Sequence, residues 1–122
     1  MSKILSCILV LVVENLKESL AFFIDKMGFR LEDSYGNPIY YAKVSRDSTA
    51  EISLLKQPNF VKNQAVVATL VFQCLNIDHL YQEFIDKGIA MEAEIGNKEY
   101  KKREFSLKDP NGYVFFFQQD IK

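Results

Sequence analysis

The sequence predicts a single α+β domain of two pseudo-symmetric halves, each folding as one strand, one helix and three further strands (βαβββ). The stretch FIDK occurs at residues 23–26 and again at residues 84–87, 61 positions later in a chain of 122 residues. Around both copies the same features follow in the same order: a helix, a glycine that ends it, an apolar strand and a glycine turn. A period of about 60 residues is long for a solenoid repeat and suits one duplicated domain.

The repeat changes its offset just after FIDK. Asn15 pairs with Asn76 at an offset of 61, whereas Gly28 pairs with Gly88 at an offset of 60. The second copy therefore reads as if one residue had been deleted near the end of its helix.

Each half contains one amphipathic helix. Asn15 is a good N-cap, and Glu18 three positions later completes a capping-box pattern. Gly28 is placed to end this helix in the left-handed conformation, and Asn76 and Gly88 have the same places in the second half. The spacing of the apolar residues puts them on one face of each helix, which is expected to cover a sheet. These residues are Leu16, Leu20, Phe23, Ile24 and Met27 in the first helix, and Ile77, Leu80, Tyr81, Phe84 and Ile85 in the second.

Apolar runs and turn signals divide the rest of the chain into strands. Strands are expected over residues 4–13, 29–33, 39–44, 50–56 and 65–74. The last two strands meet at a DPNG turn (residues 109–112), whose proline and glycine positions suit a type I turn. Module one then covers residues 1–57, a linker covers 58–64 and module two covers 65–122. A ferredoxin-like βαββαβ fold would leave one apolar run unused, so we favour βαβββ twice.

Composition places the chain among globular domains. Hydrophobic residues make up 48% of it, and the net charge of −1 gives no indication of a nucleic-acid-binding surface. Cys7 and Cys74 form no CxxC pair and are expected to be reduced thiols in a cytoplasmic protein. The apolar run ILSCILVLVV (residues 4–13) lacks a small-residue cleavage site and is too short to cross a bilayer. A buried strand without membrane contact is therefore expected there.

Two stretches resemble a known family. VVENLKESLAFFIDKMGF (residues 12–29) and REFSLKDPNGYVFFFQQ (residues 103–119) are similar to the glyoxalase/bleomycin-resistance/extradiol-dioxygenase superfamily, also called vicinal oxygen chelate. The resemblance extends over almost the whole chain. It implies two βαβββ modules whose curved sheets enclose a cavity, in a homodimer that exchanges or shares modules.

Enzymes of this superfamily typically bind a divalent metal through side chains from four equivalent strands. The resemblance places those positions at Ile8, Ser53, Thr69 and Phe116. Such an ion needs several imidazole, carboxylate or thiolate ligands, and these four residues supply none. Moving the second position to Glu51 would add a single carboxylate, and the lone histidine, His79, is expected on the surface of the second helix. We therefore expect no metal, no other cofactor and no catalytic residues at these positions.

A metal-free cavity can bind a small organic molecule. The bleomycin-resistance branch of the superfamily sequesters a bulky drug in a metal-free groove between subunits, which the resemblance makes a precedent. Strand alternation gives a lining with few polar groups, as suits an organic ligand. Arg103 is open to two interpretations: it pairs with an anionic group of the ligand, or it lies at the rim beside a surface carboxylate. The expected lining comprises Ser6, Ile8, Val10, Glu51, Ser53, Val67, Thr69, Val71, Val114, Phe116 and Gln118, with Tyr40, Tyr41, Arg103 and Phe105 as candidates on strands of undetermined parity.

Three functional hypotheses follow. In the first, the chain is a metal-independent binding protein, with antibiotic sequestration as its most concrete form. In the second, it is a glyoxalase-like lyase or another enzyme with an altered or metal-free site, for which Glu51 would be the acid or base. In the third, Phe116 fills the cavity and the domain is a scaffold without a pocket.

Overall fold

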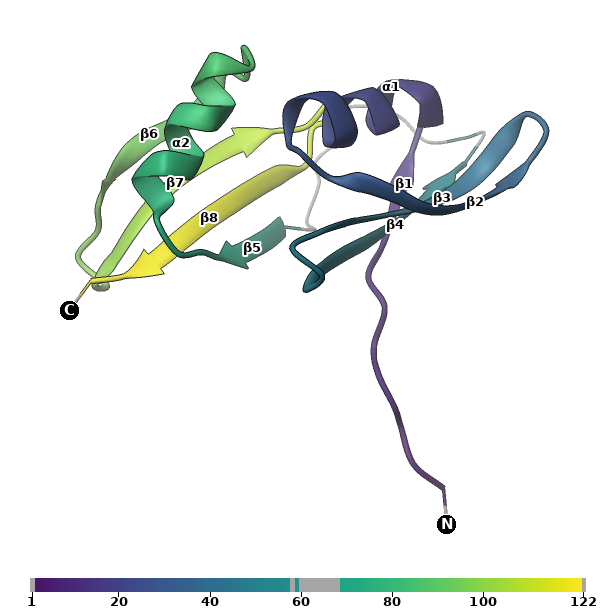
Figure 1. Ribbon diagram of the computed structural model, residues 1–122, viewed down its shortest axis with the longest axis horizontal. Coiled ribbons are helices and arrows are strands. Elements are labelled where there is room, and N and C mark those ends of the chain that lie inside the picture. Colours follow the sequence, from purple (N-terminus) through teal and green to yellow (C-terminus); the bar gives the residue numbers. More distant parts are fainter. Residues whose placement is uncertain (1, 58, 60–68, 122) are drawn as a thin grey trace.

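The computed structural model describes residues 2–57, 59 and 69–121. It contains two four-stranded sheets, with strand orders β1-β4-β3-β2 and β5-β8-β7-β6 (Figure 1). In each sheet the strand before the helix pairs in parallel with the last strand of its own module, and the other neighbours are antiparallel. The predicted α+β fold of two βαβββ modules is confirmed.

The two modules contain equivalent elements. The first comprises β1 (Val10–Val13), α1 (Leu16–Ala21), the π-helical turn η1 (Phe22–Lys26), β2 (Arg30–Gly36), β3 (Ile39–Arg46) and β4 (Ala50–Lys56). The second comprises β5 (Thr69–Gln73), α2 (Ile77–Asp86), β6 (Met91–Asn97), β7 (Lys102–Lys108) and β8 (Val114–Asp120). The expected linker (58–64, except Asn59) and the first four residues of the expected fifth strand (65–68) lie outside the described residues. In the described part of the chain no helix is long and apolar enough to cross a membrane.

The first strand is shorter than the sequence predicts. We expect a strand over residues 4–13, but only Val10–Val13 pair with β4. The parallel register puts Val10 opposite Ser53, so Cys7 would come opposite Ala50, where β4 begins. Residues 2–6 extend past the end of β4, the strand that pairs with β1 in the described part of the chain, and they are exposed.

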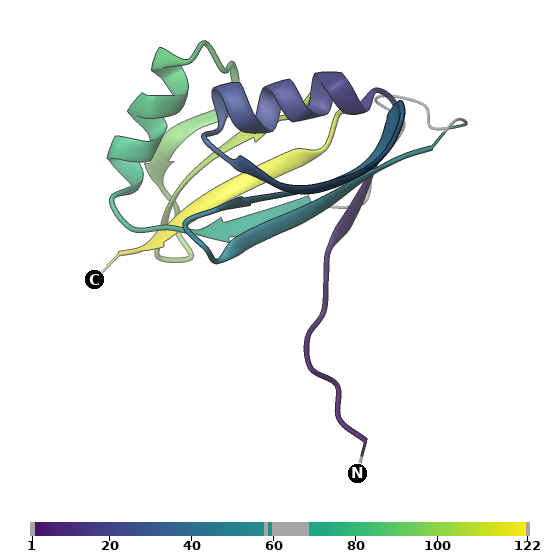
Figure 2. The same ribbon diagram turned by 45° about the vertical axis from the view of Figure 1, so that its right-hand side comes forward.

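The core lies between the helices and one face of each sheet. α1 contacts β3 and β4, α2 contacts β7 and β8, and both helices lie on the same side of the two sheets (Figures 1 and 2). Val44, Leu54, Phe105 and Phe115 point toward the helices and are fully buried. Successive strand residues point to opposite faces, so their neighbours lie on the other side of each sheet. We call that other side the helix-free face.

A π-helical turn explains the change of offset in the repeat. In η1 the Met27 N–H donates to the Phe22 carbonyl, five residues back, and the Phe29 N–H donates to the Phe23 carbonyl, six back. The counterpart of the second bond in α2 joins Ile89 to Phe84, only five residues apart. The additional residue of module one is thus taken up inside the helix, as a π-bulge does, and the strands that follow keep equivalent places.

The helix ends agree with the sequence analysis at three of four positions. Asn15 caps α1 by accepting from the Glu18 N–H at 3.1 Å, and Gly28 and Gly88 both have positive φ. Asn76 is the exception, because it adopts a left-handed conformation (φ 54°) and its side chain makes no cap bond. The Ile77 N–H of α2 donates instead to Gln119 Oε1 at 2.9 Å, so a side chain of β8 caps this helix.

The DPNG turn fastens the second module to the first. Asn111 is fully buried: its Oδ1 accepts from the Glu14 N–H at 3.2 Å, and its Nδ2 donates to Ser19 Oγ and to Asp109 Oδ2, each at 3.0 Å. The Tyr113 hydroxyl donates to the Val12 carbonyl at 2.7 Å. Burial raises the pKa of the Asp109 carboxyl above its usual range, although hydrogen bonds from Asn111, Tyr113 and Gly112 act in the opposite direction. The turn therefore holds the start of α1 from across the domain.

Replacing Asn111 tests this role. Asn111→Ala is expected to lower the free energy of unfolding by about 3 kcal/mol, because it removes three hydrogen bonds and leaves buried polar groups without partners. Urea denaturation should show a lower midpoint at an unchanged slope. Asn97→Ala is the matched control, since Asn97 is exposed and accepts one hydrogen bond, from Arg103. Equal losses for the two variants would contradict a fastening role for the turn.

Candidate functional site

The helix-free face of the second sheet contains a connected row of polar side chains. Gln73 of β5 donates to Gln118 Oε1 of β8 at 3.1 Å, and Gln118 Nε2 donates to Glu104 Oε2 of β7 at 2.5 Å. The Tyr100 hydroxyl donates to the other oxygen of Glu104, also at 2.5 Å. We call these four residues the polar row. It crosses three strands, and the carboxylate of Glu104 lies between Gln118 and Tyr100.

Glu104 is a buried carboxylate on this face. It is 5% exposed, and Ser106, two positions along β7, is 2% exposed. Their strand neighbours Phe105 and Leu107 point toward the helices, so Glu104 and Ser106 belong to the helix-free face. The hydrogen bond to Glu104 is the main cause of a raised pKa of the Tyr100 phenol, because it favours the protonated form.

Glu104 is not among the residues expected to line the cavity, where Glu51 is the expected carboxylate. The DPNG turn contains the signal that could have found it. A hairpin closing at residues 109–112 pairs Glu104 with Gln118, which was already expected to line the cavity. Adjacent residues on paired strands share a face, so Glu104 could have been placed beside Gln118.

The helix-free face of the first sheet contains a smaller polar group. The Tyr41 hydroxyl and Ser53 Oγ lie 2.9 Å apart in a hydrogen bond, and Ser53 is 1% exposed. Val10 lies opposite Ser53 in the parallel register of β1 and β4. Glu51 is exposed and forms an ion pair with Lys43 at 3.6 Å. Glu51 thus lies near the start of β4, open to water and paired with a lysine.

The remaining positions expected in the cavity lie on both modules. Phe116 of β8 is partly exposed on the helix-free face, between Phe115 and Phe117, which are buried under the helices. Val71 of β5, opposite Phe116, is half exposed. Thr69 lies in β5 opposite Val114. Ile8 lies outside β1 and is exposed, and Val67 falls outside the described residues.

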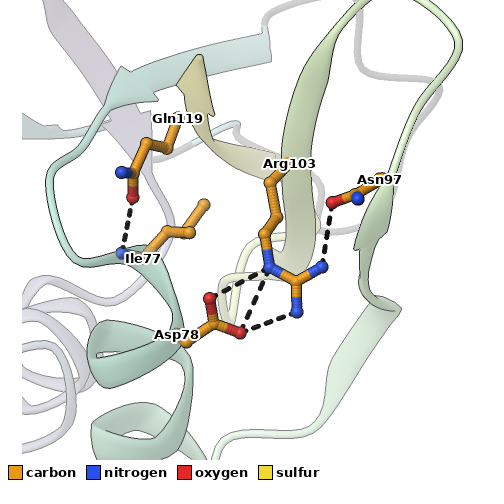
Figure 3. Close-up of polar contacts among 5 residues, drawn as sticks. All are labelled: Ile77, Asp78, Asn97, Arg103 and Gln119. Atoms are coloured by element: carbon orange, nitrogen blue, oxygen red, sulfur yellow. Dashed lines mark hydrogen bonds and ion pairs between the residues drawn. The ribbon is translucent and has the colours of Figure 1, made fainter. Parts of the chain in front are cut away.

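Arg103 and Phe105 do not face this side of the sheet. Phe105 is fully buried against α2, where its ring lies 5.1 Å from Tyr81 and 6.0 Å from Phe84. Arg103 has the same parity and reaches the first turn of α2, where Asp78 accepts from its Nε and Nη2 (Figure 3). Asn97 accepts from Nη1 at 2.9 Å. Arg103 is thus paired with a surface carboxylate, and Phe105 is buried on the helix side of the sheet.

The donor set does not fit a divalent metal. Ile8 and Phe116 carry no ligand atom, and Ser53 Oγ is already engaged by Tyr41. Among the described residues, no group of three or more His, Cys, Asp or Glu side chains is placed to hold an ion. His79 is exposed on α2, and α2 lies on the opposite side of the sheet from the polar row.

A separate hollow of about 570 Å³ lies on the helix side, where the modules meet. Phe29 and Phe72, whose ring centroids are 6.3 Å apart, contribute to its wall from both modules. Arg46 of β3 crosses the junction, forming a bidentate pair with Glu83 of α2 and donating to the Met27 carbonyl at 2.6 Å. The pair with Glu83 raises the pKa of Arg46. No sequence pattern joins residues 46 and 83, so this contact was not predictable.

The structure is a two-module α+β fold with a polar row on the helix-free face of its second sheet. The profile of the Glyoxalase/Bleomycin resistance protein/Dioxygenase superfamily matches residues 5–117, and the chain belongs to that superfamily. Comparison with curated proteins gives no significant match.

Solved structures share the fold at low sequence identity. A glyoxalase/bleomycin resistance protein/dioxygenase from Nocardioides is 16% identical with a TM-score of 0.80, covering 100% of this chain and 87% of its own. The bleomycin-binding protein complexed with bleomycin is 15% identical, with a TM-score of 0.77 and coverage of 94% and 98%. A mutant of the fosfomycin resistance protein FosX from Listeria monocytogenes, complexed with Mn(II) and dihydroxypropylphosphonic acid, is 16% identical, with a TM-score of 0.70 and coverage of 97% and 90%. These likenesses establish the fold.

The titration of Tyr100 tests the polar row. Glu104→Gln is expected to lower the pKa of Tyr100 toward its ordinary value, because the acceptor that favours the neutral phenol loses its charge. The pKa of Tyr113, raised mainly by burial at the DPNG turn, should not change. Following the tyrosine ring carbons by NMR as the pH rises past 10 would measure both residues. Glu94→Gln, on the exposed side of β6, is the control, and an unchanged Tyr100 in the Glu104 variant would disprove the contact.

Proposed function

We propose that this protein binds a small organic molecule on its helix-free faces without a metal ion, as a homodimer. The polar row is the observation that carries the proposal. Gln118 and Tyr100 donate to the buried carboxylate of Glu104, and Gln73 donates to Gln118. Apolar side chains at Val10, Val71 and Phe116 lie on the helix-free faces. Few polar groups in an apolar lining are typical of sites for organic ligands.

The charges favour a ligand with hydrogen-bond donors. The carboxylate oxygens of Glu104 accept hydrogen bonds, while the amides of Gln73 and Gln118 both donate and accept. An amine or amide of the ligand can displace part of the polar row and bond to Glu104. Antibiotic sequestration, as in the bleomycin-binding neighbour, is the concrete form of this proposal. The proposed lining is Ile8, Val10, Tyr41, Ser53, Thr69, Val71, Glu104, Phe116 and Gln118, with Glu51 at its edge.

A metal-free enzyme is the second candidate, and Glu104 is the observation that favours it. A buried carboxylate with two hydrogen-bond donors could take or return a proton if the ligand placed an acidic carbon or hydroxyl within reach. A glyoxalase-like lyase of this kind would lose turnover in Glu104→Gln while retaining binding.

Thermal unfolding of chelator-treated protein tests metal-independent binding. The panel contains glycopeptide and aromatic antibiotics, acyl and aromatic metabolites, and separate wells of Ni, Co, Mn, Zn and Fe(II). We expect a concentration-dependent rise in Tm with an organic compound and none with the metals, because only binding to the folded state stabilises it. Phe116→Asp should abolish the rise, whereas Leu75→Asp, exposed at the start of the α2 connection, should preserve it. A saturable rise with a metal would contradict the proposal.

The mass in solution tests the homodimer. Each chain covers two sheets with only two helices, so the helix-free faces expose Val10, Val71 and Phe116 to water in a single copy. Burying such faces against a second copy is favourable and gives a closed, two-fold assembly. Light scattering at micromolar concentration is expected to give twice the 14.1 kDa of one chain. A mass of one chain would remove the dimer from the proposal.

A further inference from the structure

The hollow of about 570 Å³ on the helix side lies outside the proposed ligand lining. Phe29, directly before β2, and Ala50 of β4 contribute to it from the first module, and Phe72 and Leu80 contribute from the second. Gln73 is the residue that it shares with the polar row. Pockets for small molecules typically enclose about 300–1,000 Å³ and often lie where domains meet. The size and the place of this hollow are therefore those of a binding site.

Aromatic rings form one wall of the hollow. The Phe72 ring stacks on Phe117 with centroids 4.8 Å apart, and Phe84 meets Phe117 edge to face at 5.3 Å. Phe84 and Phe117 are buried, whereas Phe72 and Leu80 are only partly covered by the core. Apolar surface thus remains open to the hollow, and a molecule that covers it is stabilised by the apolar area removed from water. An aromatic ligand can also stack on these rings or meet them edge to face.

The rim of the hollow combines apolar and neutral polar groups. Leu75 is 84% exposed at this rim, in the connection between β5 and α2. Asn76 follows it, and its side chain makes no cap bond to the helix that it precedes. An amide both donates and accepts, so Asn76 can bond to a hydroxyl or amide group of a bound molecule.

The charged groups of the hollow neutralise one another. Arg46 donates to both carboxylate oxygens of Glu83, at 2.8 and 3.1 Å, and its Nε lies 3.4 Å from Asp47 Oδ2. A ligand carboxylate would have to compete with Glu83 for this guanidinium. A ligand cation would compete with Arg46 itself, which is paired with both acids and lies 5.9 Å from the centre of the Phe84 ring. The arrangement therefore favours a ligand without charge.

We propose that the hollow is a second ligand site, which binds a neutral aromatic molecule carrying a hydroxyl or amide group. An apolar cavity of about 150 Å³ takes up one benzene ring, so this larger hollow has room for a compound of two rings. The rings cover Phe72 and Leu80, and the polar group bonds to Asn76 at the rim. The ligand contacts both modules from the helix side of the sheets. The site therefore does not depend on the function proposed for the helix-free faces.

An NMR titration of ¹⁵N-labelled protein tests the site with naphthalenemethanol as the probe. The expected result is saturable shifts of the amide signals of residues 73–76 and 79–83. Naphthoate and naphthylmethylamine present the same rings with a negative and a positive charge, and each is expected to bind at least tenfold more weakly. Absence of saturable shifts in these residues overturns the proposal, and so does equal affinity for either ion.

Two variants locate the probe on one side of the sheets. Leu75→Asp should weaken the binding of naphthalenemethanol at least fivefold, because it removes apolar surface and adds a carboxylate at the rim, and the exposed position tolerates the change. Phe116→Asp, on the helix-free face, should leave the affinity unchanged. The reverse pattern is expected for the ligand of the proposed function, so the two sites can fail separately. An unchanged affinity in Leu75→Asp, or an equal loss in both variants, overturns the helix-side site.

Protection of Cys74 from alkylation is an independent measurement. Its thiol is half-buried in the wall of the hollow, where Sγ lies 3.6 Å from the Phe72 carbonyl oxygen. Cys7→Ser leaves Cys74 as the one cysteine of the chain. Saturating naphthalenemethanol should slow the reaction of this thiol with N-ethylmaleimide at least fivefold, while the reaction of Cys7 in Cys74→Ser should keep its rate. Equal rates for Cys74 with and without the probe overturn the proposal.

Discussion

The side chain of Asn111 is the contact on which the rest of the domain depends. One amide, buried in the turn between β7 and β8, reaches the backbone before α1, a serine within α1 and an aspartate of its own turn. The turn therefore sets where the first helix starts relative to the second sheet. Phe23 of η1 and Phe115 of β8 then meet at 5.8 Å, which joins the cores of the two modules.

The π turn and the Arg46 contact make a second junction between the modules. Arg46 reaches both the Met27 carbonyl at the end of η1 and Glu83 on α2. Its guanidinium also lies 5.9 Å from the centre of the Phe84 ring. The π turn thus leaves the Met27 carbonyl to accept a hydrogen bond from Arg46. The same arginine joins the first module to α2 of the second through Glu83. An asymmetric feature of the repeat has become part of the interface between its halves.

The sequence predicted the parts of the fold that depend on local rules. The caps at Asn15, Gly28 and Gly88 and the turn at DPNG follow from backbone preferences of one or a few residues. It failed where distant residues take part: Gln119 of β8 caps α2 in place of Asn76, and residues 2–6 of the expected first strand have no β4 residue opposite them. The parity of Arg103 and Phe105 depended on the register of β7 with β8, and the DPNG turn contained that register. Arg46 and Glu83 meet only through the packing of two modules, which no local pattern encodes.

The residues that carry the family resemblance lie in the turn before β8, and residues of the proposed ligand site lie on β8 itself. Asp109, Asn111 and Tyr113 are buried in hydrogen bonds that assemble the domain, so their replacement would cost stability whatever the protein binds. Phe116 and Gln118 lie just beyond them on the helix-free face, where a side chain can change without disturbing the core. A family resemblance carried by Asp109, Asn111 and Tyr113 therefore indicates the fold and does not indicate a reaction. In this chain Phe116 places a phenyl ring on that face, and Gln118 belongs to the polar row.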